Sequence, residues 1–189
     1  MAGHPPHPGS CTATRPEARG EAVYDGVITA EQILRTWQLD ADLVTLSACE
    51  TALGKEYAGE GCVGFSQALF AAGARSLLLS LWKVEDHATM LLMTRFYQNM
   101  LGVHQERRRV GEYALEPGVR APKAEALWEA KEWLRALTGE ELRAMGAGFD
   151  RIADRGLVPV EEPSTAFGDD HPYAHPHFWA AFILTGDPR

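Results

Sequence analysis

The chain has 189 residues, of which 46% are apolar and 23% charged, and its formal net charge is −8. This size and composition predict a single globular domain, or a large part of one, with a packed core. The acidic balance argues against a nucleic-acid-binding protein, and no apolar stretch or leading segment predicts a membrane span or a secretion signal.

The first predicted feature is an irregular or disordered segment over residues 1–26, which holds four prolines and four glycines and shows no periodicity. A domain over residues 27–187 is expected to follow. Thr29 and Gln32 have the spacing of a capping box, which predicts the start of a short helix. The apolar and partly β-branched run Leu43–Ser47 then predicts a buried strand.

A helix, a strand and a second helix are predicted next. Residues 63–72 carry apolar side chains on one helical face, and Gly73 follows at a position that favours a left-handed conformation. The nearly continuous apolar run Ser76–Trp82 predicts a parallel strand that is covered on both faces. Asp86 is expected to cap the second helix. The predicted buried stripe of this helix consists of Met93, Tyr97, Met100 and Leu101.

The rest of the chain predicts a surface loop, two helices and a last strand. Residues 102–120 are polar and are interpreted as the loop, including its short basic run Arg107–Arg109. Pro122 suits the first turn of a helix, and Thr138 begins a second capping box. Residues 178–184 (FWAAFIL) predict the last buried strand. The first of these helices has a predicted buried stripe of Leu127, Ala130, Leu134 and Leu137.

The order strand, helix, strand, helices, strand indicates an α/β fold with a parallel sheet and right-handed crossovers. Three parallel strands make a small sheet whose two edges both need cover. The sheet is therefore expected to lack strands that a complete domain would have.

The candidate site is the segment Ser47–Thr51, which follows the first predicted strand. Reacting groups in open α/β sheets gather at the carboxyl ends of the strands. A thiol at Cys49 would be held there by a rigid element, as a nucleophile requires. The alternative is that Cys49 is a small buried residue that closes the strand, because free cysteines are often buried.

Six short motifs follow one another along the chain. They are S-A-C-E-T at Ser47–Thr51, G-E-G at Gly59–Gly61, A-G-A-R-S at Ala72–Ser76 leading into S-L-W at Ser80–Trp82, D-x-A-T at Asp86–Thr89, and H-P-x-x-W-A-A-F at His175–Phe182. Over Asp25–Asp187 the chain resembles the carboxyl-terminal half of the CHAT domain family. These are caspase-like cysteine-peptidase domains that are associated with tetratricopeptide repeats.

The resemblance implies a caspase-like, mostly parallel sheet of about six strands with flanking helices, of which this chain lacks the first strands. It also implies that Cys49 is the nucleophile of a cysteine endopeptidase, that the substrate is a peptide or protein, and that no metal or other cofactor takes part. A repeat-domain region or a partner chain is a further expected contact. Nucleic acid and membrane are not expected as partners, and the expected location is cytoplasmic.

The chain departs from the family in one respect. The catalytic histidine of the family lies upstream in an Ala-Thr-His-Gly motif, which this sequence does not contain. His4 and His7 lie at a suitable distance from Cys49, but they stand among prolines without a preceding strand. Loss of the base and of the oxyanion donors would leave Cys49 nearly inert as a peptidase on its own.

Three other histidines are candidates for a substitute base. His175 and His177 precede the last strand, which puts them at the wrong edge of the sheet if all strands are parallel. His87 follows the second strand at the start of a helix and is expected to be a surface residue. Zinc binding by Cys49 or Cys62 together with His171, His175 and His177 lacks the usual ligand spacing.

Several residues around Cys49 are candidates for a substrate pocket: Glu50, Thr51, Gly59, Glu60, Gly61, Glu85 and Asp86. Glu85 and Asp86 follow the second strand and would suit a basic substrate residue, whereas a helix cap is the simpler role for Asp86. The glycines at 59, 61 and 64 fit the spacing of a dinucleotide-binding loop, but they do not follow their strand tightly. We interpret them as a flexible loop beside the cleft.

Two explanations of the missing histidine stay open. In the first, the sequence is a truncated part of a cysteine peptidase. In the second, the chain is a catalytically inactive caspase-like remnant that acts as a protein-binding module. A strand ending in His-Gly in the coding region upstream of Met1 would favour the first.

Overall fold

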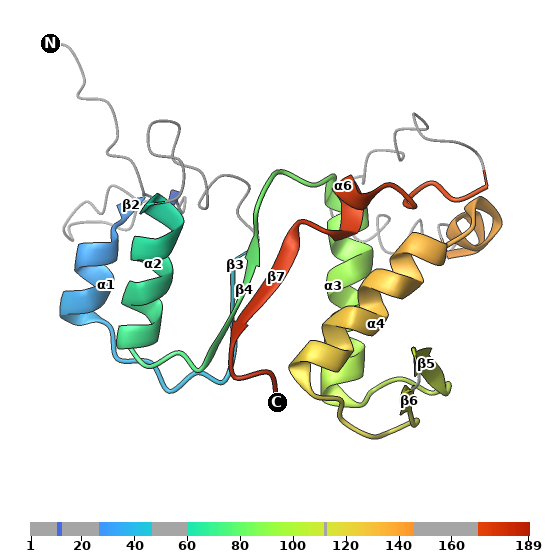
Figure 1. The fold of residues 1–189 in the computed structure, drawn as a ribbon, viewed down its shortest axis with the longest axis horizontal. Helices are drawn as coiled ribbons and strands as arrows, with labels where there is room; N and C mark the ends of the chain where they lie inside the picture. Colours follow the sequence, from blue (N-terminus) through green and yellow to red (C-terminus); the bar gives the residue numbers. More distant parts are fainter. Residues whose placement is uncertain (1–10, 13–26, 47–59, 112, 146–169) are drawn as a thin grey trace, which may run out of the picture. The chain divides into compact units, whose positions relative to one another are not determined.

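The structure is a computed structural model, and Figure 1 shows it as a ribbon. The residues that it describes are 11–12, 27–46, 60–111, 113–145 and 170–189. Two compact units divide the chain: Met1–Lys83 with Thr185–Asp187, and Val84–Leu184 with Pro188–Arg189.

The first unit contains two helices and short strands. Its elements are β1 (Cys11–Thr12), β2 (Val27–Ile28), α1 (Ala30–Thr36), β3 (Val44–Leu46), α2 (Glu60–Ala71) and β4 (Ser76–Ser80). The pair β1 and β2 is antiparallel, so Cys11–Thr12 is a short strand within the segment predicted to be irregular. The rest of that segment lies outside the described residues.

The capping box at the start of α1 is confirmed. The hydroxyl Oγ1 of Thr29 accepts a hydrogen bond from the amide of Gln32 at 3.2 Å, and Oε1 of Gln32 accepts one from the amide of Thr29 at 2.9 Å. Two free amides of the first turn are thereby satisfied. The single buried residue of α1 is Ile33, and this helix packs against α2 (Figure 1).

Helix α2 begins at Glu60, three residues earlier than predicted, and ends as expected before Gly73. The amide of Gly73 donates to the carbonyl of Phe70, and the amide of Ala74 donates to the carbonyl of Leu69, which is a Schellman motif. Gly73 has φ of +111°, and a Cβ atom there would lie 2.0 Å from the carbonyl oxygen of Leu39. Both the conformation and the space at this position therefore require glycine.

Strands β3 and β4 form the predicted parallel pair, in which Val44 lies opposite Leu77 and Leu46 opposite Leu79. All five residues of β4 are buried, whereas those of β3 are half-buried. The apolar run that predicted a strand covered on both faces is confirmed for β4.

The last strand, β7 (Phe182–Gly186), completes a three-stranded sheet in the order β3-β4-β7. The amide of Asp187 donates to the carbonyl of Arg75 at 3.0 Å, and the hydroxyl of Ser76 donates to the carbonyl of Asp187 at 2.7 Å. The carboxyl end of β7 thus meets the amino end of β4. The two strands run in opposite directions, and the sheet is mixed.

The second unit is mainly helical. Its elements are α3 (Asp86–Leu101), β5 (Arg108–Val110), β6 (Tyr113–Leu115), α4 (Lys123–Ala136), a helical segment over 139–145, and α6 (Pro176–Trp179). Helices α3 and α4 pack side by side (Figure 1). The predicted stripe of α4 is confirmed, since Leu127, Ala130, Leu134 and Leu137 are all buried.

The capping box at Thr138 is also confirmed. The hydroxyl of Thr138 accepts from the amide of Glu141 at 3.2 Å, and the Glu141 carboxylate accepts from the amide of Thr138 at 2.9 Å. These hydrogen bonds lower the pKa of Glu141, because they favour its charged form.

The predicted buried stripe of α3 is wrong. Leu101 is 48% exposed and Tyr97 is 36% exposed. The face that is buried carries His87, Ala88, Leu91, Leu92, Phe96 and Asn99. Apolar residues lie on two sides of this helix. The side that faces α4 is the one with Arg95 and Asn99, which form hydrogen bonds with Glu129.

Two further predictions are wrong: the loop over 102–120 and the start of the last strand at residue 178. The predicted loop over 102–120 contains the antiparallel hairpin β5–β6, in which Arg108 lies opposite Leu115. The last strand begins at Phe182 and not at residue 178, because Pro176 occupies the first turn of α6 and His175 caps it.

Candidate functional site

The segment Ser47–Thr51, which holds the candidate nucleophile Cys49, follows β3 in the sequence. Cys49, Glu50, Thr51 and Gly59 fall outside the described residues. Leu46 ends β3, and the parallel pairing with β4 puts the carboxyl ends of both strands at one edge of the sheet. The chain therefore enters the S-A-C-E-T segment from the edge at which reacting groups of α/β sheets gather.

Glu60 and Gly61 are the first two residues of α2, which corrects the expectation that the glycine pattern forms a loop at these positions. Both remain predictions as substrate-pocket residues.

At the start of α3 the predicted cap is wrong by one residue. The N-cap is Glu85, whose side chain makes no capping hydrogen bond, and Asp86 is the first helical residue. Asp86 is exposed, and Glu85 is half-buried. Both remain predictions as substrate-pocket residues.

His87 is buried and not a surface residue, which corrects the sequence-based expectation. It is 8% exposed, and its Nδ1 lies 2.7 Å from the hydroxyl of Tyr173, which is 1% exposed. Tyr173 in turn contacts Phe178 edge to face, with ring centroids 5.2 Å apart. The pair thus fixes the orientation of the imidazole.

Burial controls the ionisation of this pair. Desolvation lowers the pKa of His87, because it disfavours the imidazolium form. Desolvation also raises the pKa of Tyr173, and the negative charge of Glu85 adds to the effect. Both shifts favour the neutral forms near neutral pH. His87 is therefore a neutral imidazole held by a neutral phenol, which is the protonation state of a general base.

Tyr173 had no signal in the sequence. It lies in a proline- and aspartate-rich stretch without periodicity, so no pattern linked it to His87, 86 residues earlier. A tyrosine next to His171-Pro172 is ordinary loop composition. The pairing arises from the tertiary fold alone.

His175 and His177 were expected at the wrong edge of the sheet on the assumption that all strands are parallel, but β7 is antiparallel to β4, so this expectation does not hold. Nδ1 of His175 accepts a hydrogen bond from the amide of His177 at 3.2 Å and so caps α6. This capping role accounts for His175 within the described part of the chain, and both imidazoles are exposed.

Neither a metal centre nor a membrane span is found in the part of the chain that the structure describes. No group of three or more His, Cys, Asp or Glu side chains in these residues is placed to hold a metal ion. None of the described helices is long and apolar enough to cross a bilayer.

The comparisons with known proteins identify the family of the chain. The family model of the CHAT domain matches residues 7–187, which extends the resemblance further toward the amino terminus than Asp25. Comparison with curated proteins and with solved structures gave no significant match. The match covers nearly the whole sequence and includes all of the motifs described above. The chain therefore belongs to the CHAT domain family.

Proposed function

We propose that this CHAT domain is a cysteine peptidase of caspase-like fold, in which Cys49 is the nucleophile. The single observation that carries the proposal is the family match over residues 7–187, since S-A-C-E-T is the nucleophile motif in the family that the chain resembles. The position of Leu46 at the carboxyl end of β3, directly before this motif, supports the same role.

The proposed reaction forms and then breaks a thioester. The thiolate of Cys49 attacks the carbonyl carbon of the scissile peptide bond, and the amine leaves after it gains a proton. Water then attacks the acyl-enzyme, which releases the carboxylate and regenerates the thiol. A base must take the thiol proton, and the sequence contains no Ala-Thr-His-Gly motif to supply it.

Glu85 and Asp86 are proposed to select a basic side chain in the substrate. Two adjacent carboxylates at the start of α3 provide a negative field, and Asp86 is exposed. A neutral substrate side chain would gain no such attraction.

Chemical rescue tests the peptidase proposal despite the missing motif. Imidazole added to the protein would replace the absent base, so we expect hydrolysis of a fluorogenic peptide library to rise with imidazole concentration. Cys62→Ala should behave like the natural chain, and Cys49→Ala should show no imidazole-dependent cleavage. Equal cleavage by the natural chain and Cys49→Ala would reject Cys49 as the nucleophile.

A protein-binding module is the second candidate function, and the missing Ala-Thr-His-Gly motif favours it. Binding would not need the thiol. A partner captured equally well by the natural chain and by Cys49→Ala, without imidazole-dependent cleavage, would support this second function over the first.

A further inference from the structure

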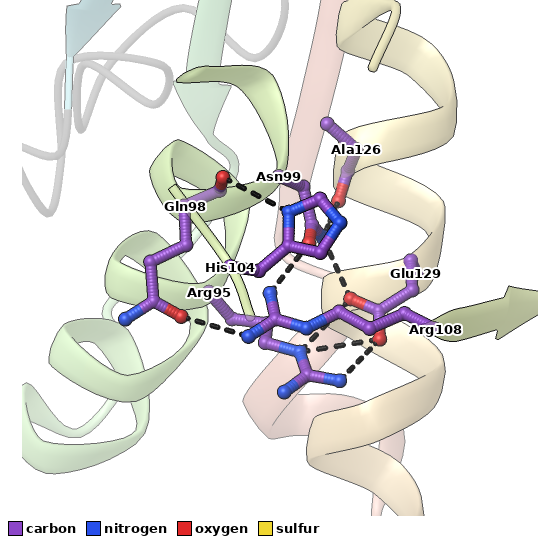
Figure 2. Close-up of polar contacts among 7 residues, drawn as sticks. All are labelled: Arg95, Gln98, Asn99, His104, Arg108, Ala126 and Glu129. Carbon is purple, nitrogen blue, oxygen red and sulfur yellow. Dashed lines mark hydrogen bonds and ion pairs between the residues drawn. The ribbon is translucent and has the colours of Figure 1, made fainter. Parts of the chain in front are cut away.

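A buried polar network joins α3, α4 and the β5–β6 hairpin (Figure 2). At its centre, Nε of Arg95 lies 3.1 and 3.0 Å from the two carboxylate oxygens of Glu129, and Nη2 lies 2.5 Å from one of them. Asn99 donates to the same carboxylate at 2.6 Å. The side chains of Glu129 and Asn99 are almost completely buried, so the pair is shielded from water.

Arg108 enters this network from the hairpin, but its hydrogen bonds go to neutral oxygens. Its Nη1 donates to Oδ1 of Asn99 at 2.6 Å, and its Nη2 donates to Oε1 of Gln98 at 3.0 Å (Figure 2). Arg95 and Arg108 together carry two positive charges against the single carboxylate of Glu129. The network therefore has an excess of one positive charge.

The lowered pKa of Arg108 is consistent with an excess of positive charge around it. Desolvation and the charge of Arg95 lower its pKa, while Glu129 and Glu106 act in the opposite direction. Glu106 is exposed, and its influence on Arg108 is the weakest of the four. No carboxylate among the described residues forms a hydrogen bond with Arg108.

Two buried nitrogen atoms in the network have no hydrogen-bond partner among the described residues: Nε of Arg108 and Nε2 of His104. His104 is 4% exposed, and its Nδ1 faces the carbonyl of Gln98 at 3.5 Å. Buried polar atoms are nearly always paired, so two orphaned atoms in one cluster call for an explanation.

The pairing of Arg95 indicates what Arg108 could bind through the edge of its guanidinium group formed by Nε and Nη2. Arg95 donates hydrogen bonds to Glu129 from Nε and Nη2, and this forked arrangement matches two oxygens of one oxyanion. Among the described residues, Nε of Arg108 has no hydrogen-bond partner, and Nη2 on the same edge bonds to the side-chain oxygen of Gln98, which is half-buried.

We propose that Arg108 is the recognition group of an oxyanion site at the β5–β6 hairpin, and that this site takes a carboxylate or a phosphate group. The incoming oxyanion replaces the Gln98 amide on Nη2 and reaches Nε. Gln98 accepts one hydrogen bond from Arg108, whereas an oxyanion can accept from both Nη2 and Nε and also pairs its own charge with the guanidinium, so the exchange is favourable at the site. It also balances the excess positive charge.

Two opposing effects keep the affinity modest. The net charge of −8 repels anions, although salt at physiological strength screens charges beyond about 8 Å. The side chain of Gln98 must also move before Nε is reached. A single phosphate group is therefore expected to bind in the millimolar range.

The test uses the full chain and inorganic phosphate, with sodium chloride at equal ionic strength as the reference. At phosphate ten times above its dissociation constant, the unfolding midpoint should rise by about 4 °C. Acetate in a parallel titration distinguishes a carboxylate ligand from a phosphate ligand. Phosphate stabilises many proteins nonspecifically, so the comparison with matched variants decides the outcome.

Arg109→Gln is the matched control. Arg109 is the exposed neighbour of Arg108 on β5, and this substitution removes the same positive charge as Arg108→Gln. It should keep the saturable response to phosphate. Arg108→Gln and Arg108→Lys should both lose it, and Arg108→Lys retains the charge while removing Nε. If the response is the same in all four proteins, or is lost in Arg109→Gln as well, the proposal is overturned.

A direct measurement covers the case in which an Arg108 variant does not fold. The Nε–H resonance of Arg108 in the natural chain, followed by nitrogen–proton NMR, should shift in a saturable manner as phosphate is added. A resonance that does not move while phosphate is raised through the millimolar range would also overturn the proposal.

Discussion

His87 and Tyr173 form a buried hydrogen bond between two groups that titrate. Both side chains are shielded from water, and the bond of 2.7 Å joins α3 to the segment before α6. Burial favours the neutral form of each group, so the bond does not depend on charge. Its contribution can therefore be measured at neutral pH as the loss of a single hydroxyl group.

Tyr173→Phe should destabilise the chain by about 1–3 kcal/mol, because it removes the partner of a buried imidazole nitrogen. The ring and its contact with Phe178 stay in place. The free energy of unfolding, measured in urea, checks this value. A change of less than about 0.5 kcal/mol, which is the size expected for an ordinary surface substitution, would contradict the role given to Tyr173.

The lowered pKa of His87 predicts a stability loss in mild acid. The unfolded chain binds a proton at His87 below its ordinary pKa of 6.5, while the folded chain binds it only at lower pH. Stability contributed by the neutral imidazole is thus complete above 6.5 and declines as pH falls through the folded pKa.

Urea unfolding between about pH 7.5 and 5.5 measures this decline, which lies above the range where carboxylates titrate. His87→Gln should flatten the dependence across this interval. A slope that is unchanged in His87→Gln would assign the effect to another group.

At the scale of elements, polar groups determine how α3 packs on α4. Arg95 and Glu129 form an ion pair whose side chains are 18% and 4% exposed, and Arg95 also lies over the ring of Trp133. Removing one partner of a buried pair leaves the other charge uncompensated. The pair therefore fixes the register of the two helices.

Glu129→Gln keeps the shape of the side chain and removes its charge. We expect a loss of about 3–5 kcal/mol in the free energy of unfolding, because two arginines then remain in a buried site without a carboxylate. Glu132→Gln on the same helix breaks the ion pair between Glu132, which is 40% exposed, and Arg135, which is 50% exposed. This substitution should lower the free energy of unfolding by less than about 1 kcal/mol. A similar cost for both substitutions would mean that the buried pair does not hold α3 on α4.

The elements that the sequence predicted correctly depend on local interactions. The capping boxes at Thr29 and Thr138 and the glycine at Gly73 follow from hydrogen bonds within one or two turns. The buried face of α3 could not be predicted in this way, because Asn99 is buried through a bond to Glu129, 30 residues away. The direction of β7 is likewise a property of the whole sheet.

In the candidate site, too, local features can be read from the sequence and contacts between distant residues cannot. A motif and the end of a strand, which are local features, predict the site at Cys49, and this remains a prediction. The environment of His87 was mispredicted because Tyr173 and the burial of the pair come from distant residues. A pattern of helical spacing cannot report such contacts.

At the scale of the whole molecule, β3 lies at one edge of the sheet that the described residues form. Among the described residues its one strand neighbour is β4, and Leu43, Val44 and Leu46 are half-buried. Exposed edges with apolar residues favour pairing with other chains. The isolated chain is therefore expected to self-associate through β3.

Val44→Lys should reduce this association, because a lysine on an edge strand opposes pairing with a second strand. Sedimentation velocity over a range of protein concentrations measures the change. Leu34→Lys removes an apolar residue that is 57% exposed on α1 and leaves the edge intact, so association should persist. A natural chain that stays monomeric and unfolds cooperatively would contradict the expectation for the edge.

The role of Cys49 as a nucleophile is tested most directly by its rate of alkylation. The three cysteines can be compared with an iodoacetamide probe near neutral pH, using the natural chain, Cys49→Ala and Cys62→Ala. We expect imidazole, added in place of the missing base, to raise the labelling rate of one thiol about tenfold, and that rise to be lost only in Cys49→Ala. A labelling rate that imidazole leaves unchanged, or raises equally at Cys11, Cys49 and Cys62, would contradict the peptidase proposal.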